Sequence, residues 1–134
     1  MLKSASMANI MVVDDEPSIV MLMKIIIERN GHKVSEASNG EEALKALGVE
    51  PPDPSAGLPD LVVLDLMMPI VNGYSVAIAM KDDPRTREIP LLIVTAKSDM
   101  RQPLSAIPAV AGFFNKPFNP RELVETIEKI LSGR

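Results

Sequence analysis

Short apolar runs alternate along the chain with longer stretches in which apolar residues recur every three or four positions. The short runs predict buried β-strands at residues 10–13, 33–37, 61–64, 91–94 and 112–114. The longer stretches predict amphipathic helices, because residues three or four apart share one helix face, and they begin near residues 17, 38, 74 and 119. This alternation predicts an α/β domain, a doubly wound parallel sheet with helices on both faces.

Two segments interrupt this regular pattern. Residues 48–60 contain four prolines, which neither continue a helix nor donate within a sheet, so we interpret the segment as an exposed, stiffened loop. Before the last strand, Pro103 and Pro108 oppose a regular helix, because a proline inside a helix costs about 3 kcal/mol. We therefore expect the fourth helix to be short, displaced or replaced by a loop.

The composition narrows the class of protein. With 134 residues the chain has the length of one domain, and we expect residues 1–8 to form an N-terminal tail and residues 9–134 the folded unit. The net charge of −4 and the absence of a basic run disfavour nonspecific nucleic-acid binding, and no apolar stretch approaches the length of a membrane span. The chain has no cysteine, which excludes disulfides and thiolate chemistry and agrees with a cytoplasmic location.

Acidic side chains follow two of the predicted strands. Asp14 and Asp15 come directly after the first strand, and Asp65 follows the third. In parallel sheets the carboxyl ends of the strands share one edge, where ligands bind. Carboxylates gathered there repel one another, and a hard divalent cation relieves this; oxygen ligands favour Mg²⁺ or Mn²⁺ over zinc. Thr95 and Lys116 follow the last two strands, and a hydroxyl beside an ammonium group suits a phosphoryl group.

Five segments together resemble the receiver domain of bacterial and archaeal response regulators, the CheY-like proteins of two-component signalling. They are Val12–Pro17, Leu64–Pro69, Asn72-Gly73, Ile93–Ala96 and Phe114–Phe118. Any one of them is weak evidence, but all five in this order and spacing are specific, and the resemblance extends from about Asn9 to Ile130. It implies a five-stranded sheet in the flavodoxin-like order 2-1-3-4-5.

The resemblance also assigns chemical roles. Asp65 would accept a phosphoryl group from a phosphohistidine on a sensor histidine kinase or a phosphotransfer protein. Asp15 and Asp65, with the backbone carbonyl of Met67, would bind Mg²⁺, and Asp14 would act mainly through a metal-bound water. Lys116 would pair with the phosphoryl oxygens.

The signalling switch follows from the same resemblance. Thr95 would turn inward to bond a phosphoryl oxygen, and Phe113 would be the coupled aromatic residue. The family tunes hydrolysis of the aspartyl phosphate at the positions of Met67 and Lys97, and we expect these bulky or long side chains to hinder the attacking water. The Lys116-Pro117 peptide bond would be cis, as is typical of the family.

Two other functions agree with parts of the pattern. A Mg²⁺-dependent phosphohydrolase with an aspartyl nucleophile would use a similar site, although such enzymes usually carry the nucleophile after the first strand. A binding module that keeps the fold without being phosphorylated would typically have lost an acid or the lysine. Because the chain ends soon after the last helix, we expect a stand-alone receiver that acts through a protein partner, and not an enzyme beyond its own phosphorylation and dephosphorylation.

Three local interpretations complete the sequence picture. Pro17 suits the first turn of a helix, and Asp15 is the candidate cap of that helix. His32 lies in a predicted turn, where we expect it to be solvated. The nine methionines are interpreted as filler of an aliphatic core.

Overall fold

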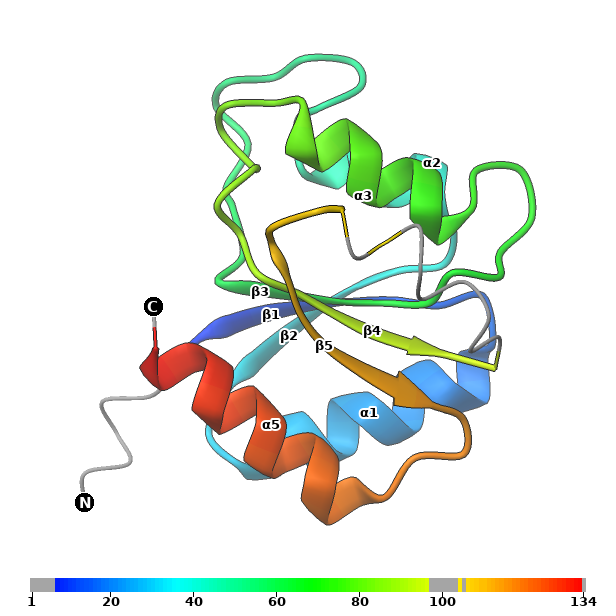
Figure 1. The fold of residues 1–134 in the computed structure, drawn as a ribbon, viewed down its shortest axis with the longest axis vertical. Helices are drawn as coiled ribbons and strands as arrows, with labels where there is room; N and C mark the ends of the chain where they lie inside the picture. Colours follow the sequence, from blue (N-terminus) through cyan, green and yellow to red (C-terminus); the bar gives the residue numbers. More distant parts are fainter. Residues whose placement is uncertain (1–6, 97–103, 105, 134) are drawn as a thin grey trace.

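The computed structural model describes residues 7–96, 104 and 106–133, which form a sheet between two layers of helices (Figure 1). The strands are β1 (Asn9–Val13), β2 (Lys33–Ala37), β3 (Leu61–Leu64), β4 (Leu91–Thr95) and β5 (Val110–Asn115). All neighbouring strands are parallel, and their order is β2-β1-β3-β4-β5. The predicted fold class and strand order are confirmed.

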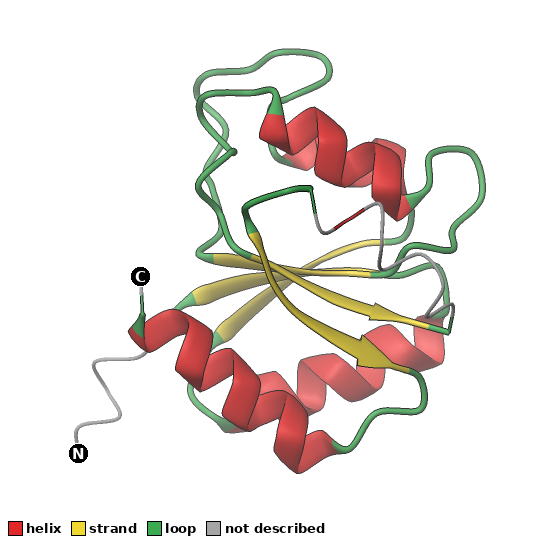
Figure 2. Ribbon diagram, viewed as in Figure 1, coloured by secondary structure: helices red, strands yellow, loops and turns green. Residues whose placement is uncertain are grey.

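The helices lie on both faces of the sheet. They are α1 (Pro17–Arg29), α2 (Gly40–Ala46), α3 (Gly73–Lys81) and α5 (Pro120–Ser132). Figure 2 shows α1 and α5 against one face and α2 and α3 against the other. Within the part of the chain that the structure describes, no helix has the length and apolar character needed to cross a membrane.

Each face of the sheet has its own apolar core. Strands β3 and β4 are buried along their whole length, so their side chains enter both cores alternately. Burial of one such aliphatic side chain stabilises the fold by about 1.5–3 kcal/mol. The methionines are only partly core filler, because Met23 and Met80 are buried whereas Met21 and Met67 are 64% and 48% exposed.

Asparagine side chains cap three of the helices. The side-chain oxygen of the residue before each helix accepts a backbone N–H of its first turn; these residues are Asn39, Asn72 and Asn119. Helix α1 begins differently, because its N-terminal cap residue is Glu16 and makes no side-chain capping bond. Our interpretation of Asp15 as the cap was wrong: the carboxylate of Asp14 accepts the N–H of Glu16 at 2.9 Å instead.

The proline-rich loop after α2 is exposed and irregular, as predicted, but it is anchored from a distance. The guanidinium of Arg85 donates to the carbonyl of Leu47 at 3.2 Å and to that of Ala56 at 2.8 Å. Gly48 has φ +73°, and a Cβ there would lie 2.3 Å from the carbonyl oxygen of Asp53. The Arg85 side chain, which follows α3, therefore anchors the loop.

The sequence placed the fourth helix in the connection from β4 to β5. Most of it, residues 97–103 and 105, lies outside the described residues. Its described end is a turn in which the N–H of Ile107 donates to the carbonyl of Leu104 at 2.9 Å. Pro108 belongs to the turn that leads into β5 and not to a helix. The described end agrees with the predicted break at Pro108.

His32 is buried, so the expectation that it is solvated was wrong. It is 4% exposed, and its Nδ1 lies 3.1 Å from the N–H of Ala8 while its Nε2 lies 2.6 Å from Oε2 of Glu128. A backbone N–H can only donate, so Nδ1 carries no proton and the ring proton sits on Nε2, which donates to Glu128. The ring thus ties the residue before β1 to the last turns of α5.

We predict that His32→Leu lowers the free energy of unfolding by about 1–3 kcal/mol, because the buried N–H of Ala8 loses its acceptor. Urea denaturation measures the change. Glu128→Gln is the milder control, since an amide oxygen still accepts the Nε2 proton. Equal stability of His32→Leu and the unaltered protein would show that the ring does not hold these elements together.

Candidate functional site

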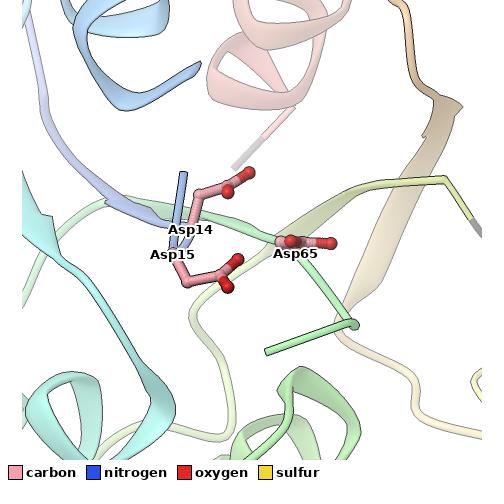
Figure 3. Close-up of side chains that lie close together, drawn as sticks. All are labelled: Asp14, Asp15 and Asp65. Atoms are coloured by element: carbon pink, nitrogen blue, oxygen red, sulfur yellow. The ribbon is translucent and has the colours of Figure 1, made fainter. Parts of the chain in front are cut away.

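The carboxyl ends of β1 and β3 bring the acidic residues together. Val13 is paired with Leu64 in the sheet, so the residues that follow them, Asp14 and Asp65, leave neighbouring strands side by side. Figure 3 shows Asp14, Asp15 and Asp65 at this edge. One carboxylate oxygen of each lies within 4.8 Å of the others. The predicted cluster is confirmed as a spatial arrangement.

Two of these carboxylates are buried. Asp14 is 1% and Asp65 3% exposed, whereas Asp15 reaches further into solvent. Burial, followed by the charge of Asp14, raises the pKa of Asp65. The N–H of Met67, 3.2 Å from Oδ1 of Asp65, and the ammonium of Lys116 act in the opposite direction without cancelling the rise. The acceptor candidate is therefore a carboxylate whose charge is incompletely compensated.

Lys116 supplies the positive charge of the site. Its Nζ lies 2.9 Å from Oδ2 of Asp14, 2.8 Å from Oε1 of Glu16 and 3.4 Å from Oδ2 of Asp65. Burial alone would lower the pKa of this ammonium, but the contacts with the carboxylates outweigh burial and hold its pKa above the ordinary value. Lys116 is therefore protonated at neutral pH.

The remaining charge balance suits a hard cation. One ammonium faces the three aspartates and Glu16, so the edge is left with excess negative charge. Oδ2 of Asp14 is buried and has no hydrogen-bond partner among the described residues, because its 2.9 Å contact with Lys116 is an ion pair without hydrogen-bond geometry. An all-oxygen donor set with an unsatisfied buried oxygen fits Mg²⁺.

Thr95 and Lys116 meet at the same edge, as the sequence predicted. Thr95 ends β4, is fully buried, and its carbonyl accepts the N–H of Lys116 at 2.9 Å. The Lys116-Pro117 peptide bond is cis, which confirms that expectation. Phe113 is half-buried in β5, against the core that α2 and α3 cover. The roles of Thr95 and Phe113 in switching stay predictions.

Met67 lies beside the acceptor candidate. Its N–H donates to Oδ1 of Asp65 at 3.2 Å, and the residue is 48% exposed. Whether its carbonyl binds a metal stays a prediction, and Lys97 lies outside the described residues.

Sequence reasoning missed two residues of the site. Glu16 contacts Lys116, and its only sequence signal is that it extends the Asp14-Asp15 pair. Gly73 was noted only as part of the family pattern, but a Cβ there would lie 2.1 Å from the carbonyl oxygen of Asp65. Glycine therefore allows α3 to begin against the backbone of the acceptor candidate.

The acidic edge borders a hollow of about 380 Å³ between α1 and β2, lined by Asp14, Asp15 and Met21 among others. A larger hollow of about 600 Å³ lies where β4 and β5 begin, beside Pro90 and Ala109. That end of the sheet is opposite to the acidic cluster. Asp14 and Asp15 of the cluster thus line the smaller hollow, whereas no residue of the cluster lines the larger one.

Known proteins share this sequence pattern. The family model of the response regulator receiver domain matches residues 10–128. The response regulator SaeR of Staphylococcus aureus (strain USA300) is 35% identical over 127 residues, which are 94% of this chain and 51% of SaeR. The chain spans about half the length of the curated relatives it matches.

Solved structures show the same likeness. The response regulator protein TrrA of Thermotoga maritima, in complex with Mg²⁺-BeF, is 36% identical with a TM-score of 0.77, over 92% of this chain and 99% of TrrA. The chemotaxis protein CheY4 of Vibrio cholerae is 27% identical with a TM-score of 0.80, over 92% of this chain and 98% of CheY4.

We predict that Asp65→Asn raises the free energy of unfolding of the metal-free protein at neutral pH. A carboxyl whose pKa is raised by folding favours the folded state when protonated. When it is ionised, it lowers the free energy of unfolding, and this destabilisation grows as the pH rises from the ordinary aspartate value of about 3.9 through the raised pKa. The advantage of Asp65→Asn should vanish below that range. Urea denaturation across this pH range measures it.

Asp82→Asn, a change at an exposed aspartate paired with Lys81, is the matched control and should show no such gain. Mg²⁺ should stabilise the unaltered protein more than the Asp65→Asn variant, because a ligand that binds the folded state stabilises it. A less stable Asp65→Asn variant at neutral pH would contradict the electrostatic account.

Proposed function

The chain belongs to the response regulator receiver domain family, and from this we propose that Asp65 is its phosphoacceptor in two-component signalling. The observation that supports Asp65 most strongly is its position. It is a nearly buried carboxylate, 3.4 Å from the Lys116 ammonium and grouped with Asp14 and Asp15. A charge placed at this cost at the end of an apolar strand indicates chemical use.

The transfer needs charge neutralisation more than covalent machinery. A carboxylate oxygen of Asp65 attacks phosphorus, a new P–O bond forms, and the P–N bond to the donor histidine breaks, its electron pair leaving with the imidazole nitrogen. Lys116 offsets the negative charge of both partners. Asp14, Asp15 and Asp65, with the carbonyl of Met67, would hold Mg²⁺, which supplies further neutralisation when bound; the same oxygens suit Mn²⁺.

The output is a conformational switch. Thr95 would donate its hydroxyl proton to a phosphoryl oxygen, and Phe113 on β5 would respond. This is supported by the burial of Thr95 and by its backbone bond to Lys116. The phosphoryl donor would be a sensor histidine kinase or a phosphotransfer protein. The phosphorylated chain would bind another protein as its target, and it would act in the cytoplasm.

We predict that incubation with acetyl phosphate and Mg²⁺ adds one phosphoryl group to the chain, measured by intact mass. Here the P–O bond to acetate breaks and acetate leaves. Asp65→Asn should abolish the addition, because an amide oxygen is a poor nucleophile, while Asp82→Asn should leave it unchanged. Steady release of phosphate from many phosphate monoesters would instead indicate a phosphohydrolase.

We predict that Met67→Asn shortens the lifetime of the phosphorylated protein on the order of tenfold, about 1.4 kcal/mol of barrier. Met67 is exposed two residues beyond Asp65, and we expect its bulky side chain to hinder the attacking water, which the smaller asparagine would admit. Loss of phosphoryl mass with time measures the rate. Ile70→Asn is the matched control, because Ile70 is exposed on the same loop and asparagine tolerates its φ of 69°. An unchanged lifetime in Met67→Asn would refute this role.

A further inference from the structure

The Lys116 ammonium is shared among three carboxylates. Its shortest contact is with Glu16, at 2.8 Å, and its longest with Asp65, at 3.4 Å. The Lys116 side chain is only 13% exposed, whereas that of Glu16 is 56% exposed. The ammonium thus lies nearer to a residue outside the predicted site than to the phosphoacceptor.

The backbone of Glu16 is fixed although its side chain faces solvent. Its N–H donates to Oδ1 of Asp14 at 2.9 Å, and its carbonyl accepts the N–H groups of Ile19 and Val20 at 3.0 and 3.1 Å. Its side chain makes no capping bond to α1. These contacts hold the Cα of Glu16 beside the site and leave its carboxylate to bind Lys116, 100 residues away in sequence.

We propose that Glu16 is a positioning residue that competes with the phosphoryl group for Lys116. This inference rests on the proposed role of Asp65 as phosphoacceptor. In the unphosphorylated protein the ammonium lies closer to Glu16, at 2.8 Å, and to Asp14, at 2.9 Å, than to Asp65, at 3.4 Å. When a phosphoryl group is present, Lys116 must leave Glu16 to reach the phosphoryl oxygens, and the Glu16 charge opposes that exchange. Glu16 therefore weakens the phosphorylated state relative to the unphosphorylated one.

The ordinary alternative is a surface ion pair, which contributes about 0–1 kcal/mol and does nothing else. Two observations favour a larger role. Lys116 is largely buried, so solvent screens the pair less than it would at an open surface. The same ammonium also contacts Asp65, so a change in the position of the ammonium changes its interaction with the phosphoacceptor.

The test uses beryllium fluoride with saturating Mg²⁺, the ligand pair present in the TrrA structure, and calorimetry to measure affinity. Glu16→Gln should lower the Kd for beryllium fluoride roughly three- to tenfold, because Lys116 is released from its competing partner. With acetyl phosphate, Glu16→Gln should lower the half-saturating concentration and leave the limiting rate nearly unchanged.

Two further variants separate the ion pair from general charge. Glu16→Asp keeps the charge but shortens the side chain, so it should behave like Glu16→Gln if contact with Lys116 is what matters. Glu36→Gln removes a charge that lines the hollow beside Asp14 and Asp15 but pairs with Lys24 at 3.4 Å, and it should leave the Kd unchanged. Urea denaturation of each variant confirms that it is folded.

The outcomes distinguish the two proposals. If the unaltered protein binds no beryllium fluoride and gains no phosphoryl mass, the assignment of Asp65 fails. If it does both, but Glu16→Gln binds no more tightly than Glu36→Gln, the role of Glu16 alone is overturned. Wild-type affinity in Glu16→Asp, with tighter binding in Glu16→Gln, would overturn the direct contact and leave only a charge effect.

Discussion

The ion cluster around Lys116 is the interaction on which the rest of the site depends. Asp14 and Asp65 are almost fully buried at the ends of adjacent strands, and burial together with the charge of Asp14 raises the pKa of Asp65. The Lys116 ammonium lies within 3.4 Å of both. Removing Lys116 would leave two buried carboxylates without this cation. The edge of the sheet is therefore organised by one cation that has more anionic neighbours than it can neutralise.

That imbalance connects stability with signalling. Tight aliphatic cores on both faces of the sheet hold the strand ends in register, so the carboxylates cannot move apart to relieve their repulsion. The edge therefore keeps an excess of negative charge, because the carboxylates outnumber the ammonium of Lys116. We expect such a site to respond to added charge, because a bound cation or phosphoryl group would offer Lys116 and Thr95 new partners. The same energetic cost that disfavours the acidic edge would then make it a sensitive switch.

Much of the fold and the core of the site could be predicted from the chain alone. Fully buried strands such as Leu61–Leu64 are continuous apolar runs. The helix caps are also local, because the side chains of Asn39, Asn72 and Asn119 each accept the N–H of the residue three positions further on. Asp14, Asp65, Thr95 and Lys116 were found because each follows a strand directly. Their convergence needed only one further rule, that parallel strands end at one edge. The strand order itself came from the family resemblance.

Apart from the local misplacement of the α1 cap at Asp15, the errors concern side chains whose partners are distant in sequence. His32 bonds to Glu128, 96 residues away, Arg85 reaches Leu47 across 38 residues, and Glu16 meets Lys116 across 100. Local spacing carries periodicity, capping and turn chemistry, because these are interactions between near neighbours along the chain. It carries no information on which helix end packs beside which strand, and that packing alone sets the distances between such partners. Local sequence patterns therefore specified the helices, the strands and the reactive groups. Tertiary packing determined which residues lie beside Lys116 and that His32 is buried.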